Sequence, residues 1–347
     1  MGVMPTDDRW ADVLGDLEMT GVFYSTGRFS APWGIALPPL PRTVMFHLLL
    51  AGDAVVQVDG TTHRMTPGDL LIVPHGTGHE ILSGPDAEPV SLWDVRRTAQ
   101  GDRYERLVIE GGGQAARLVC GAVAFTDPGV GRLLASLPAA LHAAREGEHD
   151  DAGDGSADAA DGRWLRAAIE AIGRESLDPR PGTDVVTARL ADVVLVHAIR
   201  AWLESVEPAS GWVAALRDPV LGPVLRAMHA EPARPWTLGS LAAEARLSRS
   251  TFAERFAAVV GEPPMSYVAG WRLDLAARRL REPGVTVAAV AREVGYDSGP
   301  GFHRAFVRRH GTTPGAWQRT TPVRRLEDVF PPDAPTSARV AAETISA

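Results

Sequence analysis

The sequence predicts a multidomain α+β protein with an N-terminal β-barrel, a helical connector and a C-terminal all-α domain with two helix-turn-helix units. Three features carry this prediction: short apolar runs over residues 20–125, two amphipathic segments beyond an acidic stretch, and a pattern that occurs twice between Thr237 and Trp317. The expected boundaries are 1–140 for the barrel, 141–163 for an acidic disordered loop, 164–214 for the connector, 215–322 for the all-α domain and 323–347 for a disordered tail.

The first 125 residues read as strands. Runs rich in Val, Leu and aromatic residues are separated by Gly, Pro and Asp, as is typical of short strands joined by turns. Asp59-Gly60 is a strong hairpin signal because both residues tolerate a positive φ. The spacing favours a small antiparallel barrel or sandwich.

The middle of the chain predicts a loop and two helices. Residues 145–162 are acidic, small and almost free of apolar side chains, so they cannot bury a core and are expected to be disordered. Two amphipathic segments follow. They could form a contact between two copies of the chain or pack within one copy, and the sequence leaves both open.

The repeated pattern predicts the all-α domain. Thr237 matches Thr286 at an offset of 49, and after the turn Phe252 matches Phe302 at an offset of 50. Each copy reads as a short helix, a tight turn and a second helix, which is the form of a helix-turn-helix. The second helix of such a unit lies in the DNA major groove.

Turn chemistry supports both copies. A hydroxyl side chain precedes each expected helix and can accept from its free N–H groups. Gly295 stands where the first helix of the second copy ends, a position that favours a left-handed conformation, and Arg246 stands there in the first copy. The caps are Thr237, Ser248, Thr286 and Ser298, and the pairs Phe252/Phe256 and Phe302/Phe306 are expected in the core.

A helix of about 19 residues is expected between the copies. At about 1.5 Å per residue it would be about 28 Å long. One turn of DNA is about 34 Å, so a helix of this length could place two recognition helices in successive major grooves.

Charge and cysteine content narrow the function. The net charge is −8, but residues 216–320 carry 15 Arg and 9 acidic residues and residues 1–215 carry 17 Arg and 30 acidic residues. A basic module joined to an acidic one fits a nucleic-acid binder with a regulatory half. The single Cys120 fits a reducing cytosol, and neither a membrane span nor a signal peptide is expected, which predicts a cytoplasmic protein.

Residues Gly68 to His79 fit the pattern G-x5-P-x-G-x2-H, which resembles the second signature of the cupin barrel. In metal cupins its His is a ligand, but the first signature here retains only His47, with Leu49 at the second His position. Zinc or iron needs at least three N, O or S ligands, and two His with Asp53 or Cys120 fall short. No metal or cofactor is therefore expected. His47 and His79 are expected to line an effector pocket or to serve structure alone, bonding each other, backbone or a small molecule.

The C-terminal half resembles the AraC/XylS family of bacterial transcription regulators, and the N-terminal half resembles the cupin-type sensor of one branch of it. The motifs that carry the first resemblance are Trp236-Thr237-Leu238, Leu247-Ser248-Arg249-Ser250, Phe252 to Phe256, Trp271-Arg272, Val294-Gly295-Tyr296 and Arg304-Ala305-Phe306.

The resemblance implies which residues face DNA. Exposed residues of the second helix of each copy would read base edges, where Arg can fork onto guanine and Glu can accept from cytosine. They are Arg249, Ser250, Ala253 and Glu254 in the first copy and Gly299, Pro300, His303 and Arg304 in the second, with Arg255, Arg308 and Arg309 expected on phosphates or in solvent.

The sequence therefore predicts a sequence-specific transcription regulator, not an enzyme, that binds operator DNA and responds to a small-molecule effector. RNA polymerase and a second copy of the chain are further candidate partners. A metal-dependent cupin enzyme fused to a DNA-binding module is the alternative. A third hypothesis is a DNA-binding adaptor whose barrel serves only protein contacts.

Overall fold

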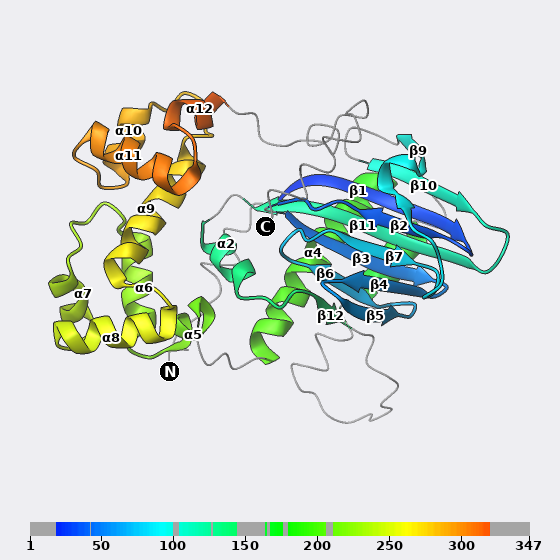
Figure 1. Ribbon diagram of the computed structural model, residues 1–347, viewed down its shortest axis with the longest axis horizontal. Coiled ribbons are helices and arrows are strands. Elements are labelled where there is room, and N and C mark those ends of the chain that lie inside the picture. The colour runs from blue at the N-terminus through cyan, green and yellow to red at the C-terminus, as the bar shows by residue number, and fades with distance from the viewer. Residues whose placement is uncertain are drawn as a thin grey trace, which may run out of the picture. The chain divides into compact units, whose positions relative to one another are not determined.

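The computed structural model describes residues 19–41, 43–99, 104–125, 128–143, 164, 167–175, 180–205 and 211–319 (Figure 1). The described chain forms two compact units. One contains Met19–Phe125 and Leu137–Ser205, and the other contains Thr126–Ser136 and the helices after Val206. We expected residues 1–140 to form one domain; the segment 126–136 instead clusters with the C-terminal helices.

The first unit contains a seven-stranded and a five-stranded sheet, which confirms a sheet-rich N-terminal half. Neighbouring strands are antiparallel except for the pairs β1/β10 and β2/β8. The larger sheet has the order β12 (Leu141–Ala143), β6 (Leu70–Val73), β3 (Thr43–Ala51), β11 (Ala115–Phe125), β1 (Met19–Ser30), β10 (Tyr104–Glu110) and β9 (Arg96–Ala99). The smaller has the order β5 (Thr61–Met65), β4 (Ala54–Val58), β7 (His79–Leu82), β2 (Gly34–Leu37) and β8 (Val90–Ser91).

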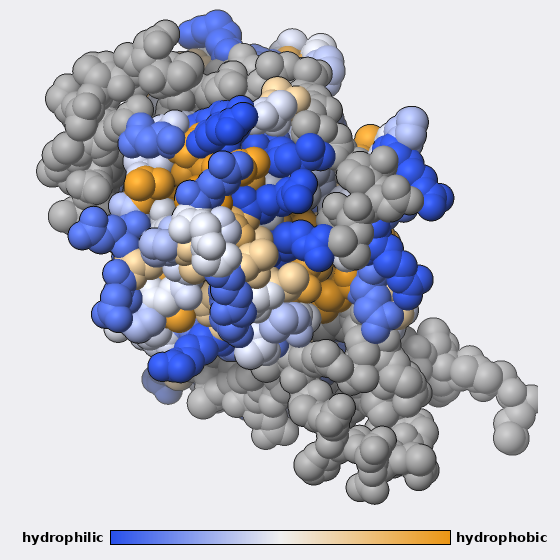
Figure 2. Space-filling view, turned by 90° about the vertical axis from the view of Figure 1, so that its right-hand side faces the viewer, coloured by the Kyte–Doolittle hydropathy of each residue, from blue (hydrophilic) through white to orange (hydrophobic). Residues whose placement is uncertain are grey.

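The core of this unit lies between the two sheets. Met45 and Leu49 of β3 pack in one apolar cluster with Val56 of β4 and Ile81 of β7. On the face that Figure 2 shows, on the side of the sheets, hydrophilic residues are interspersed with smaller apolar areas, as is usual for a surface in water.

Two turns of the sheets follow the sequence closely. Asp59 and Gly60 both have positive φ, of 49° and 71°, and join β4 to β5, so the expected hairpin is confirmed. Gly76 has φ +63°, and a Cβ there would lie 1.9 Å from the carbonyl oxygen of Leu40. No larger residue fits this turn, which leads into β7 and places His79 at its start.

Helix α4 (Thr183–Ser205) belongs to the sheet-rich unit. Its Asp192 carboxylate accepts a hydrogen bond from the Tyr24 hydroxyl of β1. Burial raises the pKa of both groups. The helix is thus fixed to a strand of the larger sheet by a partly desolvated hydrogen bond. Within the described ranges, no helix has both the length and the apolar composition needed to cross a bilayer.

The regular structure of the second unit, over the residues that the structure describes, is helical. Its helices are α2 (Pro128–Ala135), α5 (Trp212–Arg217), α6 (Leu221–Ala230), α7 (Leu238–Glu244), α8 (Arg249–Val260), α9 (Pro264–Arg279), α10 (Val287–Glu293), α11 (Gly299–His310) and α12 (Pro314–Arg319).

All four expected caps are present. Thr237, Ser248, Thr286 and Ser298 each accept a backbone N–H three residues on, at 3.1 to 3.3 Å. Gly295 has φ +81° as expected. Arg246, at the matching position, has φ +53°. Both copies therefore use the same left-handed turn, and only the second provides a glycine for it.

The helix between the copies is shorter than expected. Helix α9 has 16 residues rather than about 19, which corresponds to about 24 Å. It ends at the Leu280 cap, and Gly284 then turns the chain with φ +77°. The intervening Pro283 has no N–H for a further helical turn.

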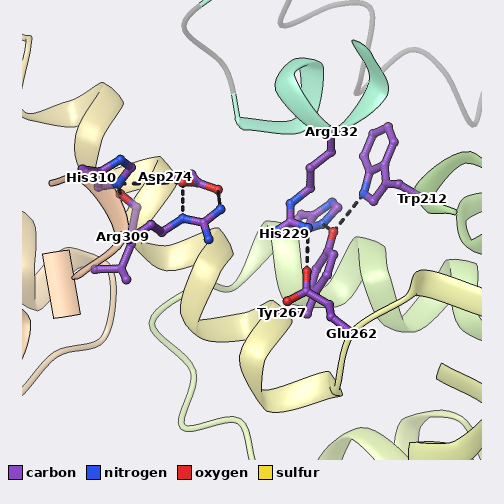
Figure 3. A network of polar contacts seen from close by, with 9 residues as sticks. Arg132, Trp212, His229, Glu262, Tyr267, Asp274, Arg309 and His310 are labelled. Atoms are coloured by element: carbon purple, nitrogen blue, oxygen red, sulfur yellow. Dashed lines mark hydrogen bonds and ion pairs between the residues drawn. The ribbon is translucent and has the colours of Figure 1, made fainter. Parts of the chain in front are cut away.

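A buried polar network joins α2 to α9 (Figure 3). The Arg132 guanidinium donates to Glu262 at 3.0 Å and lies 4.2 Å from the ring centre of Tyr267. The Tyr267 hydroxyl accepts from Trp212 Nε1 at 2.9 Å and lies 2.7 Å from His229 Nε2. Burial, and then the Arg132 charge, lowers the pKa of His229 to about 3, so this imidazole is neutral.

The same face of α9 also holds α11. Arg309 of α11 donates to both carboxylate oxygens of Asp274 at 2.5 Å. A Cβ on Gly270 would lie 3.1 Å from the Arg309 guanidinium and 3.2 Å from that of Arg132. Arg132 and Arg309 thus meet over one glycine of α9, with Glu262 and Asp274 balancing their charge.

The left-handed turn that both copies share predicts opposite effects of substitution at Arg246 and Gly295. Arg246→Gly should stabilise the α7–α8 pair by up to about 1 kcal/mol, because glycine adopts a left-handed φ without steric cost. Gly295→Ala should destabilise the α10–α11 pair by more than about 1 kcal/mol, because its Cβ would lie 2.9 Å from Ala233 Cα. Urea-dependent hydrogen exchange of residues 238–260 and 287–310 measures the pairs separately. Destabilisation by Arg246→Gly would contradict the argument.

The network gives a second prediction. Arg132→Ala should destabilise the helical unit by about 1–3 kcal/mol, since a partly buried ion pair and a cation–π contact are lost together. Arg292→Ala is the matched control from the same unit, because this exposed side chain bonds only the Ala288 carbonyl of its own helix, at 3.4 Å, among the described residues and should matter by less than about 0.5 kcal/mol. Hydrogen exchange of α9 in urea checks both. Equal effects would mean that Arg132 has no special role.

Candidate functional site

The outer face of α8 is polar. Phe252 and Phe256 are fully buried on its inner side. Of the five residues of α8 predicted to contact DNA, four are exposed, namely Arg249, Ser250, Glu254 and Arg255, and Ala253 is half-buried. Their contact with DNA stays a prediction.

The matching face of α11 is more basic at its centre than at its start. His303, Arg304 and Arg308 are exposed, while Phe302 and Phe306 are buried. The first turn consists of Gly299, Pro300 and Gly301, which carry no hydrogen-bonding side chain. Proline is tolerated there because the N–H that it lacks would have had no helical partner.

The arginines on these faces differ in what holds them. Arg255 donates to Asp218 at 2.8 Å, and this ion pair competes with the expected phosphate contact. Arg249 lies over α7, where a Cβ on Gly239 would be 3.1 Å from its Nε. Arg304 and Arg308 form no ion pair with any residue that the structure describes. These two guanidinium groups are therefore the most available to an outside anion.

The sheet-rich unit contains the second candidate site. His47 of β3 and His79 of β7 are buried, and their Nε2 atoms lie 2.6 Å apart. His79 Nδ1 lies 2.8 Å from the Thr77 carbonyl oxygen. The expected hydrogen bond between the two imidazoles is confirmed, and so is a hydrogen bond between His79 and the backbone. Their contact with a ligand stays a prediction.

His47 lines a cavity of about 30 Å³ between the sheets. Ser25 of β1, Cys120 of β11 and His47 of β3 lie directly opposite one another in register across three neighbouring strands. All three line this cavity, and the rest of its wall is almost wholly apolar. Burial raises the pKa of the Cys120 thiol to about 12, so it is protonated and a poor nucleophile.

The residues of this cavity do not fit a metal ion. Leu49, at the position of the second His of the metal-binding signature, is fully buried in the apolar core. Asp53 accepts from Gln114 and is exposed. No group of three His, Cys, Asp or Glu is placed to hold a metal within the ranges that the structure covers. The two imidazoles also direct a nitrogen at each other, where a metal would need both free.

Two features of these sites were not predicted from the sequence. The polar row that includes Ser25 depends on strand register, which no local pattern specifies. The acidic partners Asp218 and Asp274 lie 37 and 35 residues from the arginines that they hold. The one sequence signal for these acidic partners is that Asp274 lies among apolar residues of α9.

Two family models match the chain. A cupin model matches residues 8–204, and a helix-turn-helix domain model matches residues 241–320. The cupin model spans nearly all of the sheet-rich unit together with α2, and the helix-turn-helix model spans the helical unit from within α7 to α12.

Relatives match over most of their length. A putative AraC-like transcription regulator of Streptomyces lividans is 34% identical over 283 residues, which cover 80% of this chain and 88% of the relative. A similar protein of Streptomyces antibioticus is 33% identical over 80% of this chain and 88% of its own. The regulator AlkR of Acinetobacter baylyi is 28% identical over 88% of this chain and 97% of its own. The chain therefore belongs to the family of AraC-type transcription regulators whose N-terminal domain is a cupin.

Proposed function

We propose that the chain binds operator DNA through two helix-turn-helix units, α7–α8 and α10–α11, with α8 and α11 entering successive major grooves. One observation carries the proposal: both helices bury a phenylalanine pair and leave an arginine-bearing face exposed. Helix α9 joins the two helix-turn-helix units. Its length is about 24 Å, which becomes comparable with the 34 Å repeat of DNA once the width of the flanking helices is added.

The exposed residues divide by chemistry into two groups. Arg249 and Arg304 suit guanine, and Glu254 suits the amino group of cytosine. Ser250 and His303 can donate or accept at neighbouring base edges. Arg308, one turn beyond Arg304, suits a phosphate, and Arg255 does so only if its bond to Asp218 is given up.

For the sheet-rich unit we propose effector binding in a cupin-type barrel formed by the two sheets, and no catalysis. The polar groups around His47 and His79 suit contact with a small-molecule ligand. They do not fit the metal of a cupin oxygenase. The protein would work in the cytoplasm, where its operator is and where Cys120 stays reduced.

The path of the chain suggests how the two activities are coupled. Strand β11, whose Cys120 lines the cavity, leads within a few residues into α2. Helix α2 packs in the helical unit through Arg132, beside the Asp274 anchor of α11. We propose that a change in β11 alters this packing and so shifts the balance between arrangements of α8 and α11.

The DNA contact predicts a strong salt dependence. The affinity of the full chain for its operator should fall linearly on a double logarithmic plot as salt rises, because bound phosphates release counterions. Arg308→Ala should lower the slope by about one and weaken all sequences alike. A fluorescence anisotropy titration between about 50 and 200 mM salt tests this. Flat affinity across the series would contradict groove binding by basic helices.

Base reading gives a separate prediction for α11. Arg304→Ala should weaken operator binding by about 1–3 kcal/mol and relax preference at one base pair, as expected for an arginine on guanine. Binding to a panel of single-base operator variants measures this, with Arg308→Ala as the matched control from the same face. A uniform loss over the whole panel would make Arg304 a phosphate contact instead.

A further inference from the structure

The cavity between the sheets offers one polar contact that the protein leaves open. Among its polar wall residues, Ser25 lies opposite Cys120 in register, and its hydroxyl acts to lower the pKa of the Cys120 thiol against the larger effect of burial. His47 is bonded through Nε2 only. Its Nδ1 is fully buried and has no partner among the described residues. Among the side chains that line the cavity, His47 Nδ1 is therefore the buried nitrogen or oxygen that has no partner within the described residues.

The direction of the hydrogen bonds decides what that nitrogen can do. A carbonyl oxygen only accepts, so His79 must donate its Nδ1 proton to Thr77. A neutral imidazole carries one proton, so His79 Nε2 is an acceptor and His47 Nε2 must donate to it. His47 Nδ1 then carries a lone pair and no proton. The series of hydrogen bonds from the Thr77 carbonyl through His79 thus leaves His47 Nδ1 as a hydrogen-bond acceptor.

Both imidazoles are neutral, as this derivation requires. Burial lowers the pKa of His79 to about 4, and burial together with the neighbouring His79 lowers that of His47 well below its usual value. A protonated His79 would reverse the bond to His47 and make its Nδ1 a donor. That state is absent near neutral pH.

The remaining wall determines what else the ligand must be. It is made of apolar side chains such as Phe23, Phe29, Met45, Ile81 and Leu118. It contains no Arg, so an anion would be buried without a partner, which is strongly unfavourable. An acceptor left unsatisfied in such surroundings is unfavourable, and a ligand that donates to it would remove this cost.

We propose that the effector is a small, uncharged and mainly apolar molecule that donates one hydrogen bond to His47 Nδ1, as an alcohol or a phenol does. This inference rests on the proposed effector-binding function of the cavity. The cavity of about 30 Å³ is well below the roughly 150 Å³ that accommodates benzene in an apolar core. A ring-sized ligand must therefore move the walls, β11 among them, which is what a signal to α2 requires.

The test compares phenol with toluene on the full chain by isothermal titration calorimetry. The two molecules have nearly the same shape, and only phenol donates. Toluene is the more hydrophobic, so a cavity without an open acceptor would prefer toluene. We expect phenol to bind at least about fivefold more tightly, in line with one buried hydrogen bond. Equal binding, a preference for toluene, or binding of neither molecule overturns the proposal.

Two variants locate the contact. His47→Leu should abolish or reverse the preference for phenol, and Arg174→Ala, at an exposed side chain of the same unit that does not line the cavity, should keep it. A preference that survives His47→Leu overturns the proposal. If His47→Leu does not fold, the comparison of the two probes on the natural chain still decides. Operator binding of the same preparation is measured in parallel. Intact DNA binding with no phenol preference rejects the ligand class alone, whereas loss of DNA binding rejects the proposed function.

Discussion

Burial of the two phenylalanine pairs decides how the helical unit can be used. Because Phe252 and Phe256 lie on one side of α8, and Phe302 and Phe306 on one side of α11, only the opposite side of each helix remains accessible. The DNA contacts proposed for the exposed arginines depend on this constraint and not on local charge alone. Removing the apolar pairs would leave the same exposed residues with no fixed face on which to act.

Helix α9 connects the two helices that carry these faces. It carries Tyr267, which packs against Phe256 with ring centres 5.5 Å apart, and Asp274, which holds Arg309 of α11. Helix α9 is therefore in contact with both α8 and α11, and toward α11 an apolar cluster that includes Leu273 and Phe306 accompanies the Asp274–Arg309 ion pair. Helix α2 contacts it between these points at Gly270.

Much of this could be predicted from the sequence because it depends on neighbours along the chain. The caps at Ser248 and Ser298, the left-handed Gly295 and the hairpin at Asp59-Gly60 are local, and the structure confirms them. The place of α2 was not predictable, because Arg132 and Glu262 are separated by 130 residues and no periodicity links them. The length of α9 was overestimated, since its apolar stripe continues past the residue where the helix ends. For the site, the sequence indicated which histidines meet, but the free Nδ1 of His47 follows only from the geometry of three bonded groups.

The unequal copies have a consequence for symmetry. The start of α8 carries Arg249 and Ser250, whereas the start of α11 carries Gly299 and Pro300, so the two helices are not interchangeable. A dimer related by a twofold axis matches a palindromic operator. A single chain that binds DNA through both helices, as proposed, has no such axis, and the site on DNA would have a polarity. Bound in this way, one chain would point in one direction along the duplex.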